Sequence, residues 1–341
     1  MNKLNNQRDN SIDILRFIGL TCIMLAHINP PRDVIFQLRT FDVSLMVFIS
    51  GLAYAGRSIS NYWDFLKRRL FRLVVPVYIF LAGYFIFNYL FAQVGVVEQI
   101  PTEKIWGSFF LQLMPSIEYV WIIRIFLTIM LITPLLVKIE ECIKSDWLFI
   151  TLIVALFAGQ YYLVEWLKPL DAGRFVDDYI LYLAYSIPFL IGLRIKNAAK
   201  WFQWLIVSLL AAAFIGMAIK ITGDGGRWLS MHSHKYPPGL YFLLWGSLVS
   251  AFLWTTKEYW LRLFEWKWVY FIAQNTIWIY LWHIPFIKPV KFYLADAGWA
   301  TRLIVVYSIG IAIFFLQNKL IDYIDQKGGD KSGFLKKYFR G

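Results

Sequence analysis

Long apolar segments recur along the whole of this 341-residue chain. A helix that crosses the hydrocarbon core of a bilayer needs about 20 mostly apolar residues. The segments that approach this length lie at residues 11–28, 41–57, 72–94, 119–138, 147–166, 178–194, 201–221, 237–255, 268–288 and 301–321. The second and the sixth are the shortest. This repetition predicts an all-α integral membrane protein, a bundle of about ten transmembrane helices.

The composition agrees with a membrane protein rather than a soluble one. Hydrophobic residues make up 59% of the chain and charged residues only 16%, against about 45–50% and about 25% in soluble domains. Residues 104–115 are apolar but too short to span, and we expect them at the interface. The first segment is followed by "INPPRD" rather than by a small-residue cleavage site, so it is expected to stay as a helix.

We interpret the net charge of +12 as a signal that orients the chain in the membrane. With both termini in the cytoplasm, the inner segments hold about twice as many Lys and Arg residues as the outer ones, as the positive-inside rule expects. The sequence therefore predicts a membrane domain over residues 1–321 and a basic cytoplasmic tail over 322–341. Anionic lipid headgroups would attract this tail, unless it is disordered. No nucleic acid is expected as a partner.

Arg16 and His27 lie within the first apolar segment, where burying either side chain is costly. Their spacing of eleven residues leaves them about 20° apart around a helix and about 16 Å apart along its axis. Asp13 precedes Arg16 by one turn, close enough to form an ion pair. The alternative to a functional site is that Arg16 snorkels to the inner lipid headgroups and that His27 caps the helix at the outer interface. Both groups on one face favour a functional site.

The other polar residues divide between the two sides of the predicted bundle. The topology places all four histidines in the outer half or on the outer side: His27, His232, His234 and His283. The basic run "KRRLFR" at 67–72 lies on the inner side. One side thus offers groups for proton transfer and the other offers cations suited to phosphates. His232 and His234 lack neighbouring carboxylate or thiol ligands, and the only cysteines are Cys22 and Cys142, so no metal site is expected.

Several stretches, in order along residues 11 to 290, resemble the membrane acyltransferase 3 family of bacterial O-acyltransferases. The R-x10-H pattern of the first helix is the strongest of them. The others are "DVSLMVFISGLAYA", "FLKRRLFRLVVPVYIF", "YVWIIRIFLTIMLITPLL", "KYPPGLYFLLWG" and "NTIWIYLWHIP". Each motif is short and apolar, but their shared order is specific. The SGNH-type esterase domain that some members append is not expected, so the membrane core or a partner would complete the transfer.

The resemblance implies an enzyme of the bacterial cytoplasmic membrane that moves an acyl group from cytoplasmic acyl-CoA to a hydroxyl of an extracytoplasmic glycan. Acetyl is the usual group, with acetyl-CoA as donor substrate and no bound cofactor. His27 would be the catalytic base or an acyl-accepting nucleophile, and the sequence does not choose between these roles. Arg16 would act with it and meet the CoA. Arg68, Arg69 and Arg72 would hold the CoA phosphates.

Further residues are expected to line the acceptor site or to support catalysis: Asp13, Asp42, Ser50, Trp121, Arg124, Lys235, Tyr236, Tyr280 and His283. Arg124 would bind glycan or stabilise an oxyanion, or else snorkel. His283 and Tyr280 would orient His27 or the acceptor, or else form an interfacial aromatic cluster. Asp42 suits a helix N-terminus, and Ser50 begins a small-residue pair typical of close helix packing.

Two other classes of function stay open from the residues alone. A polytopic transporter or flippase also has buried charges, but no repeat relates the two halves and no pair of broken short helices is evident. A receptor for an acylated ligand would show no turnover. The expected partners are acyl-CoA, a surface or lipid-linked glycan, membrane lipids and, as an open possibility, a second copy of the chain.

Overall fold

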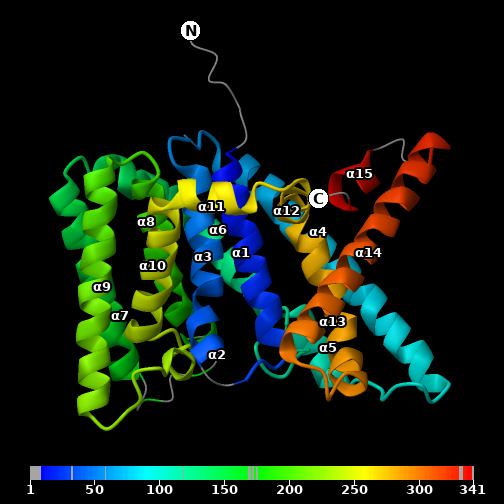
Figure 1. Cartoon of the computed structure of the whole chain (residues 1–341). Helices are drawn as coiled ribbons and strands as arrows, with labels where there is room; N and C mark the ends of the chain where they lie inside the picture. The colour runs from blue at the N-terminus through cyan, green and yellow to red at the C-terminus, as the bar shows by residue number, and fades with distance from the viewer. Residues whose placement is uncertain are drawn as a thin grey trace.

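The computed structural model describes residues 9–31, 34–57, 59–117, 119–167, 170, 173, 176–329 and 333–339. Every regular element in these ranges is a helix, and the long helices stand side by side (Figure 1). The all-α prediction is therefore confirmed.

Seven helical stretches are long and apolar enough to cross a membrane. They are α1 (Asn10–His27), the stretch Val34–Tyr54 that holds α2 (Val34–Leu38) and α3 (Asp42–Tyr54), α4 (Tyr62–Gln93), α6 (Trp121–Cys142), α7 (Asp146–Leu167), α9 (Lys200–Gly223) and α14 (Trp299–Gln326). These stretches make the chain a multi-pass membrane protein. α4 begins ten residues before the predicted segment, because Asn61 caps it by accepting a bond from the Asp64 amide at 3.1 Å.

The other predicted spans are short or interrupted. α8 (Ser186–Ile195) follows a 3-10 turn, η4 (Leu181–Tyr185), and α10 (Leu240–Thr255) begins only after Gly239. The prediction of one continuous helix over residues 268–288 is wrong. α12 (Lys267–Gln274) stops at Asn275, whose side-chain amide donates to the Phe271 carbonyl at 2.6 Å, and α13 (Thr276–Tyr293) starts anew. An amide that satisfies a carbonyl at a helix end favours such a break.

Three short helices lie at the ends of the bundle. α5 (Thr102–Phe109) confirms that the stretch at 104–115 does not span. α11 (Lys257–Phe264) lies at the end where α1 begins, and α15 (Phe334–Phe339) lies at that same end (Figure 1). α14 runs past residue 321 to Gln326, and α15 then folds back so that the Trp278 indole donates to the Tyr338 carbonyl at 2.9 Å.

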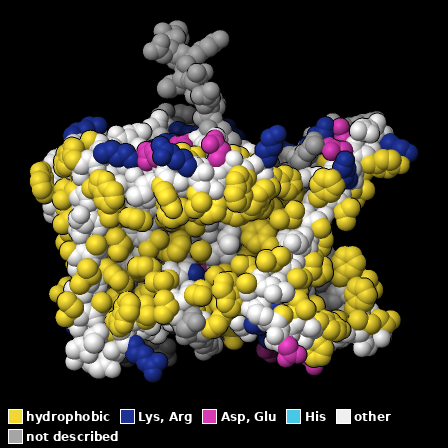
Figure 2. Space-filling model, viewed as in Figure 1, with side chains coloured by type: hydrophobic (Ala, Val, Ile, Leu, Met, Phe, Trp, Pro, Cys, Tyr) yellow, Lys and Arg dark blue, Asp and Glu magenta, His cyan; other side chains and the backbone are white. Residues whose placement is uncertain are grey.

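The surface matches a bilayer environment. Figure 2 shows hydrophobic side chains covering a broad band across the visible face, with Lys, Arg, Asp and Glu gathered mainly at the two ends. Large apolar side chains on the long helices are exposed, among them Phe87, Val154 and Ile219 at 60–67%. In water such a surface would be an aggregation hazard, whereas lipid solvates it.

α3 and α8 approach closely through glycines. A Cβ at Gly51 would overlap the Phe189 carbonyl, and one at Gly192 would overlap the Phe48 carbonyl. Small residues let helix backbones meet in this way in membranes. The contact holds α3, and with it Asp42, against the centre of the bundle.

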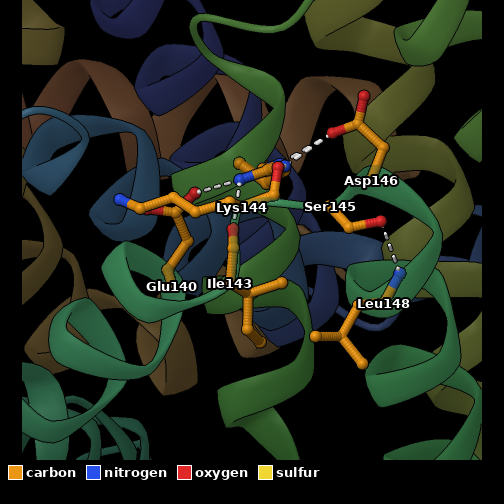
Figure 3. Close-up of polar contacts among 7 residues, drawn as sticks. Glu140, Ile143, Lys144, Ser145, Asp146 and Leu148 are labelled. Atoms are coloured by element: carbon orange, nitrogen blue, oxygen red, sulfur yellow. Dashed lines mark hydrogen bonds and ion pairs between the residues drawn. The ribbon is translucent and has the colours of Figure 1, made fainter.

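Arg194 at the end of α8 fixes the turn between α6 and α7. Its guanidinium donates to Asp146 at 2.6 Å, to Glu140 at 3.1 Å and to the Ile143 carbonyl at 3.0 Å. Figure 3 shows the turn residues from Glu140 to Asp146 that receive these bonds, with Ser145 accepting from the Leu148 amide at the start of α7. Planar guanidinium forks suit such multiple acceptors.

Candidate active site

α1 ends at His27 for local reasons. Asn29 adopts a φ of 53°, the left-handed conformation common just past a helix end, and Pro30 and Pro31 cannot continue the helix. The capping Asp9 fixes the other end by accepting from the Ser11 amide at 3.0 Å. The single helix from Asn10 to His27 therefore carries both Arg16 and His27, as the sequence predicts.

His27 belongs to a chain of hydrogen bonds between α1, α13 and the segment before α6. Its Nδ1 lies 2.8 Å from Nε2 of His283. Nδ1 of His283 is bonded to the Tyr280 carbonyl, and the Tyr280 hydroxyl donates to the Tyr119 carbonyl. His27 also packs on the Tyr119 ring, with centroids 4.7 Å apart. His283 is fully buried and His27 half-buried.

These partners fix where the protons lie. A carbonyl oxygen only accepts, so Nδ1 of His283 carries its proton. In the neutral imidazole, Nε2 of His283 then accepts from Nδ1–H of His27. Nε2 of His27 is left without a proton, and no bond to it occurs among the described residues. It therefore offers a lone pair, as a base or nucleophile requires.

A second polar group lies at the start of α3. Arg39 donates to Asp42 at 2.8 Å, and the Lys235 ammonium lies 3.7 Å from the other Asp42 oxygen. All three side chains are at most 5% exposed. Arg39 and Lys235 are close enough to act electrostatically on His27. One carboxylate between two buried cations leaves a net positive charge beside the histidine pair.

Lys235 lies outside the spanning helices, in the segment joining α9 and α10. Burial lowers the pKa of its ammonium from the ordinary 10.5 to about 8; Asp42 opposes this shift and Arg39 adds to it. Its ammonium also lies 5.4 Å from the Trp121 ring centroid and 5.5 Å from that of Tyr236. These aromatic faces partly replace the water that the cation loses.

α6 contributes Trp121 and Arg124 to the same region. The Trp121 ring meets Tyr236 edge-on at 5.3 Å and Tyr182 at 6.1 Å. Arg124 is 3% exposed, with its guanidinium carbon 5.5 Å from the Tyr182 centroid. It faces the protein interior rather than the lipid headgroups. We call the contacting side chains of His27, Arg39, Asp42, Tyr119, Trp121, Arg124, Lys235, Tyr280 and His283 the His27 cluster.

The predicted acyl-CoA residues lie toward the opposite end. Arg16 donates to Asp13 at 3.1 Å, and Asp13 is 1% exposed, so the predicted pair forms. Arg69 packs over the Tyr54 ring at 5.2 Å, while Arg68 and Arg72 are exposed on α4. α1 and α4 both begin at the end where α15 lies (Figure 1).

Within the described part of the chain, Ser50 makes no hydrogen bond with the His27 cluster. Its hydroxyl donates to the Met46 carbonyl one turn earlier on α3, at 3.1 Å, and the next residue is the close-packed Gly51. Its position fits the packing interpretation. His232 and His234 stand in the segment before α10, and among the described residues no group of three His, Cys, Asp or Glu side chains could hold a metal ion.

The sequence did not point to two residues of the His27 cluster, Arg39 and Tyr119. Arg39 precedes Asp42 by three positions, the mirror of the Asp13–Arg16 spacing, and that i, i+3 pattern could have pointed to it. Tyr119 acts through its ring and its backbone carbonyl. A backbone acceptor leaves no signal in residue types.

The seven long apolar stretches and the His27 cluster define a multi-pass helical membrane protein with a candidate site for proton transfer. A family model described as an acyltransferase domain, that of the acyltransferase 3 family, matches residues 9–316. The chain therefore belongs to the acyltransferase 3 family, as its motifs predict, and acyl transfer is the activity that this membership implies. No curated protein and no solved structure matches the chain.

Proposed function

We propose that this protein transfers an acyl group, most simply acetyl, from cytoplasmic acyl-CoA to a hydroxyl of an extracytoplasmic glycan. The observation that carries the proposal is the hydrogen bond between His27 and His283, because it leaves Nε2 of His27 unprotonated. Membership of an acyltransferase family supports the reaction class.

The proposal includes an orientation. The chain crosses the bacterial cytoplasmic membrane about ten times, with α8, α10 and α13 completing the set of long helices, and both termini are cytoplasmic. Arg16 and the arginines of α4 then meet the CoA phosphates from the inside. The pantetheine arm extends along α1 toward His27, and the glycan approaches from the outside.

In direct transfer the acceptor hydroxyl attacks the thioester carbonyl while Nε2 of His27 takes the hydroxyl proton. The new C–O bond forms, the C–S bond breaks, and the thiolate leaves with its electron pair. That thiolate then takes the proton from Nε2–H, which restores the neutral imidazole. The net positive charge of Arg39, Asp42 and Lys235 favours the oxyanion that develops.

In the covalent alternative Nε2 of His27 attacks the thioester itself. A C–N bond forms, the C–S bond breaks, and the Nδ1 proton passes to Nε2 of His283 across the 2.8 Å bond. The acceptor hydroxyl then attacks the acyl group, His283 returns its proton as the C–N bond breaks, and the hydroxyl proton ends on the thiolate.

The test uses the full chain in lipid nanodiscs with acetyl-CoA labelled in the acetyl group and a surface-glycan fraction. Wild type, His27→Ala and Arg16→Ala run side by side. We expect label on glycan with wild type and its loss in both variants. A quench without glycan separates the routes, since label on His27 marks the covalent one.

Failure has a clear form. If wild type moves no label and shows no saturable acetyl-CoA binding, the proposal is wrong. Transfer that survives unchanged in His27→Ala would remove the histidine from its assigned role.

A further inference from the structure

A cavity opens beside the His27 cluster, at the end of the bundle where α1 stops (Figure 1). Its volume is about 900 Å³. Its walls are the last turns of α7 and α9, η4, and the segment that leads into α10; we call it the α7–α9 cleft. This volume lies near the upper end of the range for small-molecule sites, about 300–1,000 Å³. The cleft is therefore larger than a single sugar ring requires.

Residues that line the cleft contact the His27 cluster. Tyr182 and Tyr236 line the cleft, and both pack edge-on against Trp121 of the cluster. Lys235 and Tyr236 are neighbours in sequence, yet the Lys235 ammonium approaches Asp42 while Tyr236 lines the cleft. A ligand bound in the cleft would therefore lie beside the His27 cluster.

The lining suits a ligand with hydroxyls and apolar ring faces. Tyr161 and Tyr236 present aromatic rings, and the Lys220 ammonium donates to the Tyr161 hydroxyl at 2.9 Å. Glu165 and Asp224 add exposed carboxylate acceptors. Sugars offer both donors for such acceptors and C–H faces that pack on aromatic rings. A lipid chain would desolvate these charged groups without pairing them.

Hydrogen bonds hold the cleft in shape. Gln160 is 6% exposed and donates to the Pro238 carbonyl at 2.9 Å and to the Leu181 carbonyl at 3.2 Å, which ties α7 to two other walls. The Tyr241 ring stacks on Phe214 of α9 with centroids 4.8 Å apart. A site assembled before the ligand arrives does not have to order its walls on binding.

We propose that the α7–α9 cleft binds the sugar units that flank the acylated one, so that the acceptor is an oligosaccharide or polysaccharide and not a single sugar. This inference rests on the proposed function. It adds the size of the acceptor and a binding site that the acyl-CoA and histidine residues do not include.

The experiment measures acetyl transfer as a function of acceptor length. A surface-glycan fraction is de-O-acetylated, cut by mild acid and separated into single sugars, disaccharides and tetrasaccharides. Wild-type protein in nanodiscs should show kcat/KM at least about tenfold higher for tetrasaccharides than for single sugars. Tyr161→Ala should bring this ratio close to unity, while Tyr161→Phe keeps the ring and most of the gain.

Tyr162→Ala is the matched control. Tyr162 is the next residue on α7, is 70% exposed and does not line the cleft. The ratio of kcat/KM for tetrasaccharides to kcat/KM for single sugars should therefore be the same in Tyr162→Ala as in wild type. The same ratio in Tyr161→Ala and wild type, or a wild type indifferent to length, would overturn the inference while transfer itself upheld the proposed function. No transfer by wild type to any fraction would overturn both.

Discussion

Nδ1 of His27 and Nε2 of His283 lie 2.8 Å apart although 256 positions separate them in the chain. α1 delivers the first histidine and α13 the second, and the Tyr280 carbonyl sets the tautomer of the pair. The arrangement resembles other sites where a second group holds a catalytic imidazole in one orientation. Under the proposed function, His283 is accordingly a positioning residue that accepts the hydrogen bond of His27 Nδ1–H.

His283→Ala should therefore reduce kcat for acetyl transfer by about 10²-fold, because His27 loses the partner that fixes its proton. The acetyl-CoA dissociation constant should hardly change. His283→Gln retains an amide oxygen that can accept from Nδ1–H of His27, and it should recover part of the rate. Single-turnover transfer and equilibrium binding measure the two quantities. Wild-type kcat in His283→Ala would refute the positioning role.

Under the proposed function, Arg16→Ala should weaken acetyl-CoA binding about tenfold or more, because it removes the charge-assisted contact that we assign to a phosphate. Arg16→Lys should recover binding only in part, since an ammonium lacks the planar fork. The control is Arg262→Ala, which removes an exposed cation from α11 at the end where α1 begins. Titration with labelled acetyl-CoA gives the constants, and equal weakening in Arg262→Ala would mean that the effect is only net charge.

The buried ammonium of Lys235 should make the free energy of unfolding depend on pH. Its folded pKa of about 8 lies below the ordinary 10.5, so the unfolded chain binds more protons between these values. The free energy of unfolding should then rise with pH across that window, by up to about 3 kcal/mol. Lys235→Met should lack this rise. Denaturant titration in detergent at pH 7, 8, 9 and 10 measures both proteins, and parallel curves would contradict the prediction.

The sequence predicted well what depends on local spacing. The first helix, the Asp13–Arg16 pair and the placement of Arg16 and His27 on one helix follow from helical geometry and apolar length. The long spans followed for the same reason. Their ends moved where a cap such as Asn61 extended the helix beyond the apolar run.

What the sequence could not predict depends on contacts between distant segments. The segment around Asn275 is apolar on both sides, so hydropathy does not indicate the break between α12 and α13. The sequence predicts that His283 orients His27 or the acceptor, but the bond of His283 to the Tyr280 carbonyl, and the tautomer that follows from it, depend on the three-dimensional fold. Arg39 was missed because its importance comes from burial beside Asp42 and Lys235.

Gly51→Ala should destabilise the protein by about 1–3 kcal/mol, because the added Cβ forces α3 and α8 apart. Gly192→Ala should do the same from the other helix. Gly83→Ala is the control: it lies in the membrane-spanning α4, and a Cβ there meets nothing within 4 Å. Unfolding in detergent gives the free energies. Because Asp42 starts α3, the two destabilised variants should also transfer acetyl more slowly than Gly83→Ala at the same temperature. Equal stability of all three variants would mean that α3 and α8 adapt to the extra methyl group and that their close approach is not required.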